Sequence, residues 1–328
     1  MKNVPGLAVC LAVAVVAFAL GRLLPLVGGP VFAIVIGMIL ATLRKPGERI
    51  TPGIRFASRQ ILQLSIIVLG ANLSLEQIVR NGLHSLPVMA GTLAIVLVAA
   101  YFVGGAFGVD RDMRRLIGVG TAICGGSAIA ALSTVIESSE ADIAYAISTV
   151  FLFNIVAVLV FPPLGHLLEL SQNAFGLWAG TAINDTSSVV AAGFVYGHAA
   201  GNEAVIVKLT RTTLIIPIVL FYAFKQLSKR RREANRIDWK GIVPWFILGF
   251  VAAALLDTFG AIPATWHNGL TQIALFLIVT ALAGVGLSAD FKRMREAGIK
   301  PLALGLILWI LIATSSLALA RVTGLGAG

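Results

Sequence analysis

Long apolar stretches recur along the whole chain, and they constrain its fold more than any other feature. A transmembrane helix needs about 20 mainly apolar residues to cross about 30 Å of hydrocarbon. Eleven stretches qualify, with short polar loops between them: 5–24, 27–43, 60–79, 85–107, 115–136, 141–163, 173–195, 204–226, 240–258, 266–288 and 299–321. The sequence therefore predicts an all-α polytopic membrane protein with about 11 transmembrane helices, in which residues 1–328 form a single membrane domain.

The composition argues against a soluble protein. Hydrophobic residues make up 58% of the 328 positions, charged residues only 12%, and the mean hydropathy is +0.94, whereas a soluble domain carries about 25% charged residues. Cys10 and Cys124 form neither a disulfide framework nor a metal pattern. The sequence also lacks the motifs of a P-loop, a zinc site or a proteolytic triad. We therefore expect no nucleic-acid partner, no metal, no cofactor and no enzymatic activity.

The distribution of Lys and Arg predicts the orientation. If the N-terminus is cytoplasmic and all eleven stretches cross, the cytoplasmic segments hold most of the 25 basic residues, as the positive-inside rule requires. The exceptions are Arg22, Arg80, Lys208, Arg211 and Arg321. The basic loop 227–239 then lies inside, and the acidic loop with Glu137, Glu140 and Asp142 lies outside. We expect a bacterial inner-membrane protein with an external C-terminus, and a miscounted span should disturb this division.

Two features of the N-terminal region bear on the first three stretches. The first stretch follows Lys2 and is rich in small residues, so cleavage as a signal peptide is an alternative, although its apolar run is longer than usual for one. Residues 50–59, with Arg55 and Arg59, are predicted to lie along the cytoplasmic face before the third span.

Two pairs of similar sequence segments indicate an internal repeat. LGANLSLEQ, at the end of the third stretch, resembles AGVGLSADF at the end of the tenth, and the same spacing relates Ser74 to Ser288 and Gly91 to Gly305. These stretches would run in opposite directions, as in an inverted-topology repeat, although Gly and Ser are common enough in membrane helices for chance similarity. The string GTAI occurs at 120–123 and again at 180–183, in the two stretches with the most chemistry.

A glycine-rich interruption in the fifth stretch, GVGTAICGGSAIAA, predicts a broken helix. Gly125, Gly126 and Ser127 lie in its middle. An unwound segment exposes backbone N–H and C=O groups inside the membrane, and transporters use such groups to bind ions. Close helix packing through small residues is the alternative, but it explains a Gly-Gly-Ser cluster less well than scattered glycines. We interpret these three residues as candidate anion ligands.

Five polar residues interrupt the seventh stretch, which reads GTAINDTSSVVAAG. An ionisable group inside the bilayer is expensive and by default marks an ion or substrate path, so Asp185 is the most informative of them. The alternatives are a structural salt bridge and a carboxyl that burial keeps neutral. We predict that Asn184 and Asp185 bind a coupling ion or gate the site. The adjacent hydroxyls are predicted to bind substrate: Thr186, Ser187 and Ser188.

The eighth stretch supplies positive charge. In VIVKLTRTTLIIP, Lys208 and Arg211 are three residues apart and share one helix face. Arg can hold a tetrahedral oxyanion through its planar fork of donors, so both residues are predicted to bind substrate. Alternatively, Lys208 snorkels to the external interface and Arg211 pairs structurally with Asp185. Asn154 and Asn72 are further candidates, either lining the cavity or satisfying a neighbouring helix.

Three motifs in order resemble those of one family. GTAICGGSAIAA at 120–131, NDTSSVVAAG at 184–193 and VKLTR at 207–211 are similar to the YeiH-like bacterial membrane proteins, which are described as sulfate exporters. Members usually have His, in an HDT string, where this chain has Asn184, so a proton-transfer role does not carry over to that position. The family is grouped with bile-acid symporters and sodium/proton antiporters. This grouping implies an inverted-repeat fold with interrupted core helices, a scaffold domain and frequent homodimers.

These features predict a secondary active transporter that moves a small oxyanion, sulfate-like or sulfite-like, by alternating access, with export as the expected direction. Asp185 would bind a coupling proton or Na⁺, or hold Arg211 until substrate displaces it. A cation-coupled symporter of an organic carboxylate and an anion channel are the alternatives. The expected partners are the anion, the lipid bilayer and a second copy of the chain.

Overall fold

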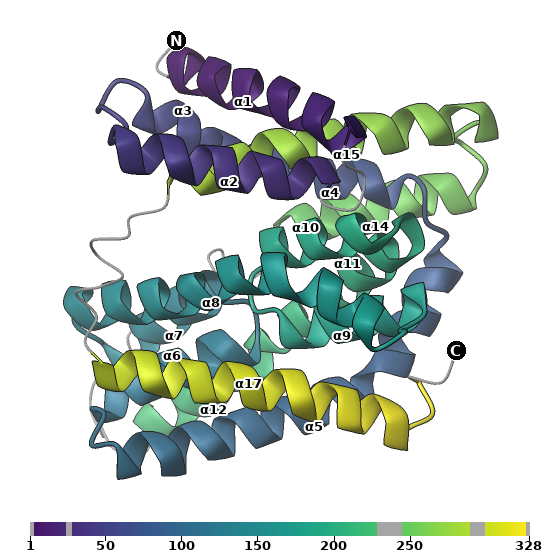
Figure 1. Ribbon diagram of the computed structural model, residues 1–328. Helices are drawn as coiled ribbons and strands as arrows, with labels where there is room; N and C mark the ends of the chain where they lie inside the picture. Colours follow the sequence, from purple (N-terminus) through teal and green to yellow (C-terminus); the bar gives the residue numbers. More distant parts are fainter. Residues whose placement is uncertain (1–2, 24–27, 228–244, 289–298, 326–328) are drawn as a thin grey trace.

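The regular structure of the chain is helical wherever it is described, as the sequence predicts (Figure 1). The computed structural model describes residues 3–23, 28–227, 245–288 and 299–325. Its α-helices are α1 (Val4–Leu23), α2 (Gly28–Leu43), α3 (Thr51–Phe56), α4 (Leu62–Gly70), α5 (Leu75–Ala106), α6 (Arg111–Ala122), α7 (Gly126–Ile136), α8 (Glu140–Leu167), α9 (Gln172–Ala182), α10 (Thr186–Tyr196), α11 (His198–Thr213), α12 (Ile215–Leu227), α14 (Trp245–Thr258), α15 (Ala264–Leu287) and α17 (Ile299–Val322). The predicted basic loop 227–239 lies outside these ranges from residue 228 onward.

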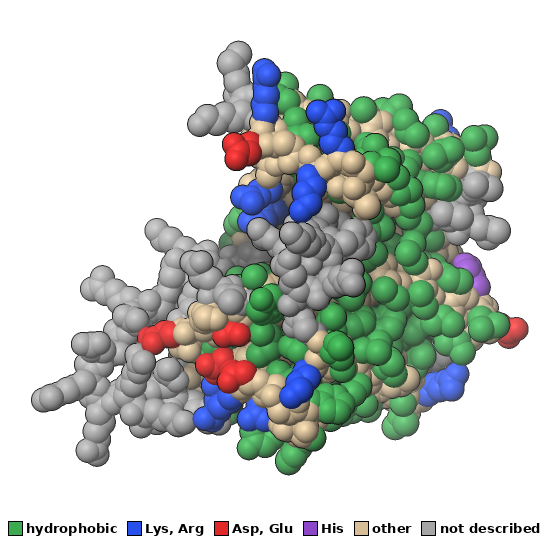
Figure 2. Space-filling model, turned by 60° about the vertical axis from the view of Figure 1, so that its left-hand side comes forward, with side chains coloured by type: hydrophobic (Ala, Val, Ile, Leu, Met, Phe, Trp, Pro, Cys, Tyr) green, Lys and Arg blue, Asp and Glu red, His purple; other side chains and the backbone are tan. Residues whose placement is uncertain are grey.

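The outer surface of the helix bundle is apolar, as expected for a protein surrounded by lipid. Five helices in the described ranges are long and apolar enough to cross a membrane: α1, α5, most of α8, most of α15, and α17. Large apolar side chains point outward from the bundle, among them Phe102 at 66% exposure and Trp266 at 63%. Figure 2 shows a mainly hydrophobic flank, with Lys and Arg gathered toward the end of the bundle that carries α3 and α6. The chain is therefore a membrane protein.

Residues 50–59 differ from the predicted surface helix. Thr51–Phe56 continues through a π-helical turn, Ala57–Ile61, into α4 without leaving helical backbone angles. Ile54 and Ala57 are buried, while Arg55 and Arg59 face outward. The wider π turn adds one residue to the helix and keeps the buried side continuous. This segment and α4 therefore form one continuous helix, residues 51–70.

The helices pack as two groups that share α10 and α11. In the first group α1, α2, α4, α14 and α15 surround a core that includes Cys10, Ile34 and Phe250. In the second, α5, α6, α7, α8, α12 and α17 surround a core that includes Leu116 and Leu308. Buried residues of α10 and α11 join the first core, and α10 also contacts α2 and α15.

Two of the predicted spans, 115–136 and 173–195, turn back instead of crossing. In the second, α9 and α10 are antiparallel: the rings of Phe175 and Tyr196 stack 3.8 Å apart, and Tyr196 Oη donates to the Leu170 carbonyl. In the first, α6 and α7 fold back so that a Cβ added to Gly120 would lie 2.7 Å from Ile129 Cδ1. Each stretch is therefore a re-entrant hairpin of two half-helices.

The long helix α8 shows how the hairpins are placed. Its Val150 side chain lies 3.6 Å from the Cβ position of Gly125, at the tip of the first hairpin. One turn later, Asn154 binds the tip of the second. At its C-terminal end, His166 stacks on Tyr196 at 4.3 Å, beside the base of the second hairpin. The hairpins therefore enter from opposite ends of the bundle, and their tips meet in the middle (Figure 1).

The two ends of the bundle can be named by residues they hold. At the Lys300 end, α5 finishes beside the start of α17, and Lys300 Nζ is 3.7 Å from the Cβ position of Gly108. At the Leu325 end, the starts of α5, α9 and α11 surround one pocket together with the end of the chain. The first hairpin opens toward the Lys300 end and the second toward the Leu325 end.

Candidate functional site

The tip of the first hairpin is a strained turn with an open helix start. Gly125 has φ 69° and ψ −125°, a backbone conformation that side chains rarely adopt. No side chain caps the N-terminus of α7. A Cβ added to Gly126 would meet no heavy atom within 4 Å, and Ser127 is exposed. Ser127 Oγ lies 2.9 Å from Cys124 Sγ and donates to Cys124 O at 3.3 Å. The space beside Gly126 at the start of α7 is open, and there the helix dipole favours an anion.

The tip of the second hairpin is held by side chains. Asp185 is the N-cap of α10 and accepts from the Ser187 N–H at 2.9 Å and the Ser188 N–H at 3.4 Å; it also accepts from Ser187 Oγ. Asn154 Oδ1 accepts from the N–H groups of Asn184 and Asp185, at 3.1 Å each. Capping of this kind fixes the turn, because it satisfies donors that the helix leaves unpaired.

The two tips touch. A Cβ at Gly125 would lie 3.8 Å from both Cα and Cβ of Asp185. Asp185 and Thr186 are partly accessible, as is Gly126, whereas Asn184 is only 1% exposed. The open N-terminus of α7 and the capped N-terminus of α10 therefore border one region near the middle of the bundle.

Lys208 and Arg211 of α11 bind the carbonyl groups at both tips. Lys208 Nζ donates to Ile123 O at 2.6 Å and to Ile183 O at 2.9 Å. Arg211 Nε donates to Ala122 O at 2.7 Å, and its Nη1 donates to Thr181 O. Each cation thus joins the C-terminal end of α6 to that of α9, where the helix dipoles place partial negative charge. Their three-residue spacing lets one helix face carry both contacts.

Burial changes what these cations can contact. Both side chains are 0% exposed, so they lie behind the tips and not at the accessible surface. Asp185 forms no ion pair with Arg211 among the described contacts, and Lys208 does not snorkel to an interface. One terminal nitrogen of Arg211, Nη2, is buried without a hydrogen-bond partner in the described part of the chain.

The ionisable side chains at the tips are two bases and one acid. The partial charges at the two helix C-termini and the two helix N-termini offset one another. Lys208 and Arg211 lie opposite the single carboxyl group of Asp185 in a region of low dielectric. An anion at the start of α7 would lie near both bases without touching either.

Most residues predicted for the site do meet at the tips, and one does not. Asn72 lies at the end of α4 and donates to Val68 O at 3.4 Å, away from both hairpins. Ser187 and Ser188 are buried, at 3% and 4% exposure, and their backbone N–H groups donate to Asp185. Both serines therefore support the tip and do not face the accessible region. Sequence reasoning missed the carbonyl groups that Lys208 and Arg211 bind. The repeated GTAI string was the available signal, since α6 and α9 each end at its alanine.

The fold and the site define a polytopic membrane protein with two opposed re-entrant hairpins. The sequence model of a family described as Conserved hypothetical protein 698 matches residues 5–305, and the chain belongs to this family. It is similar to a UPF0324 membrane protein of Fusobacterium nucleatum, with 40% identity over 98% of both chains. It is also 39% identical to one of Clostridium tetani over 92% of both chains. A relative in Streptococcus pneumoniae is 40% identical over 99% of this chain and 98% of its own.

Proposed function

We propose that this protein is a secondary active transporter that exports a small oxyanion, sulfate-like or sulfite-like, by alternating access. The observation that carries the proposal is the uncapped start of α7 beside two buried cations. An open helix N-terminus offers several backbone donors to an oxyanion, and the nearby basic side chains favour a negatively charged ligand. Both tips lie where substrate sites of transporters with broken helices are found, near the middle of the membrane.

The internal repeat supports transport over other membrane functions. The half-helices α7 and α10 span 126–136 and 186–196, at the same spacing as the two GTAI strings. Each hairpin is followed by a helix that runs to the opposite end of the bundle, and the two units enter from opposite ends. An inverted-topology repeat would produce this arrangement, and alternating access depends on repeats of that kind. In the other pair of similar segments, Ser74 follows the end of α4 and is the N-cap of α5, and Ser288 is the C-cap of α15.

In this proposal the N–H groups of Gly126 and Ser127, the Ser127 hydroxyl and Thr186 contact the anion. Lys208 and Arg211 act from behind, holding the tips together and supplying charge. Asp185 borders the anion and carries the coupling proton or Na⁺, because a neutralised carboxylate removes repulsion between the two negative groups.

The two hairpins place residues 139 and 173 on opposite sides of the membrane from those that eleven crossings would give them. With the Lys300 end in the cytoplasm, a membrane-impermeant maleimide supplied there should label Ser139→Cys and not Asn173→Cys. The native thiols Cys10 and Cys124 are buried and should give little background; Lys300→Cys serves as the cytoplasmic reference. Labelling of Asn173→Cys together with Lys300→Cys would contradict the hairpins.

Flux of radiolabelled sulfate into proteoliposomes, with and without a proton or Na⁺ gradient, tests the function. We expect saturable flux that one of the gradients accelerates. Rates that neither saturate nor depend on a gradient would favour an anion channel. Competition by organic carboxylates, without competition by sulfate analogues, would favour the symporter alternative.

The substitution Asp185→Asn should uncouple transport from the gradient. An Asn oxygen can still cap α10, so the tip is retained, but the side chain no longer exchanges a proton or binds Na⁺ as a carboxylate does. We expect sulfate exchange within about twofold of wild type and loss of gradient-driven accumulation of about tenfold or more. Full accumulation in this variant would remove Asp185 from the coupling step.

A further inference from the structure

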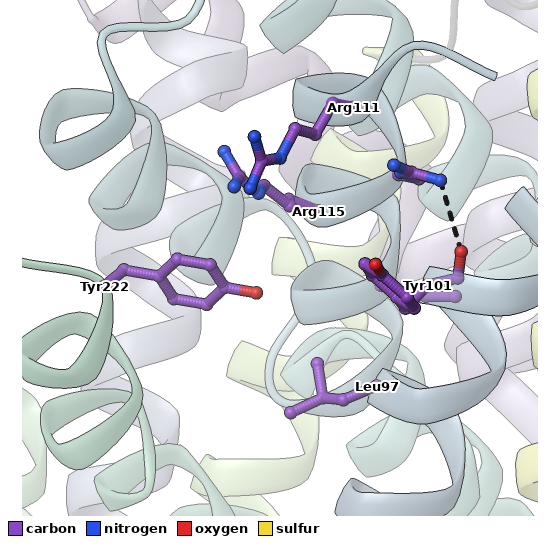
Figure 3. A pocket seen from close by; sticks show the side chains of 8 residues that line it. Leu97, Tyr101, Arg111, Arg115 and Tyr222 are labelled. Atoms are coloured by element: carbon purple, nitrogen blue, oxygen red, sulfur yellow. Dashed lines mark hydrogen bonds between the residues drawn. The ribbon is translucent and has the colours of Figure 1, made fainter. Parts of the chain in front are cut away.

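We propose that the start of α6 forms a binding site for a phosphate group, most simply the headgroup of an anionic phospholipid in the leaflet at the Lys300 end. The site is a pocket of about 70 Å³ between α5, α6 and α12 (Figure 3). It is remote in role from the hairpin tips, and the proposal does not depend on transport.

Three arginines supply the charge of this pocket. Arg111, Arg114 and Arg115 line it, and the described lining includes no acidic side chain. Figure 3 shows Arg111 and Arg115 extending from α6 toward the side of the pocket where Tyr222 lies. Guanidinium groups that share one small pocket repel one another unless an anion lies between them, and Arg presents the planar donors that phosphate oxygens accept.

The arginine side chains are held in place by their neighbours. Arg114 Nη1 donates to Tyr101 O at 3.2 Å, and its guanidinium lies 5.2 Å from the centre of the Tyr101 ring. Arg115 lies 5.8 Å from the centre of the Tyr222 ring, and its Nη1 is 2.8 Å from Asp112 Oδ1. Asp110 is occupied as the N-cap of α6. A guanidinium carries five N–H donors, so these contacts leave others for a ligand.

The deeper part of the pocket favours a lipid over free phosphate. Its floor is apolar, formed by Leu97, Ala100 and Gly118. Leu97 lies one turn before Tyr101 along α5, farther from the Lys300 end. Tyr101 and Phe102 are exposed at 61% and 66% and face the lipid beside it, as aromatic side chains do at a membrane interface. The small charged pocket matches a phosphate, and the exposed Tyr101 and Phe102 beside it match the glycerol and acyl chains attached to that phosphate.

Native mass spectrometry of the purified full chain tests the site, with phosphatidylglycerol and zwitterionic phosphatidylcholine as probes. We expect preferential retention of phosphatidylglycerol, reduced about fivefold in Arg111→Gln and further in the Arg111→Gln/Arg115→Gln double variant. Arg111 is exposed, so its replacement should leave the fold intact. Arg44→Gln, an exposed arginine outside the pocket, is the matched control and should retain the lipid.

Equal retention of the two lipids, or an equal loss in Arg44→Gln, would overturn the proposal. Inorganic phosphate is the second probe. The pocket would be assigned to free phosphate if millimolar phosphate displaced phosphatidylglycerol from the wild type. In that case phosphate should not change the residual lipid binding of Arg111→Gln. Persistence of the lipid in phosphate would assign it to the headgroup.

Discussion

The substitution Gly126→Val is expected to abolish sulfate flux while the protein remains folded. A Cβ at this position would meet no heavy atom within 4 Å, and the residue does not have a left-handed φ, so a branched side chain fits without strain. The new methyl groups would occupy the space in front of the first N–H groups of α7. Loss of a preorganised oxyanion donor costs enzymes about 100-fold or more, and we expect a similar loss of flux.

The matched control for this change is Gly269→Val. Gly269 lies in α15, is exposed, and likewise has open space at its Cβ position. The two variants therefore add the same side-chain volume at a helical position with open space. Flux near wild type in Gly269→Val, with matching thermal unfolding of both variants, would locate the effect at the hairpin tip. Normal flux in Gly126→Val would refute the anion site.

The substitution Arg211→Met should destabilise the protein as well as stop transport. Methionine replaces the aliphatic stem of Arg but donates no hydrogen bond, so the carbonyl groups of Ala122 and Thr181 lose their donor. Each buried carbonyl left unpaired costs about 1–3 kcal/mol. Part of this loss is offset because the buried guanidinium no longer has to be desolvated. We expect a clearly lower temperature of unfolding for the purified protein, together with loss of sulfate flux.

Two comparisons separate this effect from a general loss of charge. Arg22→Met removes an exposed arginine, which lies 4.9 Å from the centre of the Phe18 ring, and should change the unfolding temperature little. Lys208→Met should resemble Arg211→Met, because Lys208 also bridges the two tips. Wild-type stability and flux in Arg211→Met would show that the tips do not depend on this bridge.

The Lys and Arg pattern could not reveal the two hairpins. No Lys or Arg occurs between Arg115 and Lys208, and this interval contains both hairpins and α8. If neither 115–136 nor 173–195 crosses the membrane, only α8 changes its direction across the membrane. The basic loops before and after this interval therefore stay on the side that the charge pattern predicts. Acidic residues such as Glu137 and Asp142 contribute little to orientation. Their loop therefore moves to the Lys300 end without any conflict with the charge pattern.

The sequence by itself determined the membrane class, the helical content, the break in the fifth stretch and the polar interruption of the seventh. Apolar stretches exclude water, and Gly125 and Asp185 interrupt them in ways a continuous helix does not favour. Only the tertiary structure decided that each broken stretch turns back, since hydropathy is the same for a crossing and for two buried half-helices. It also decided the role of Lys208 and Arg211. Their partners are backbone carbonyls, which every residue carries, so the repeated GTAI string marked the two helix ends but could not identify the contacts made there.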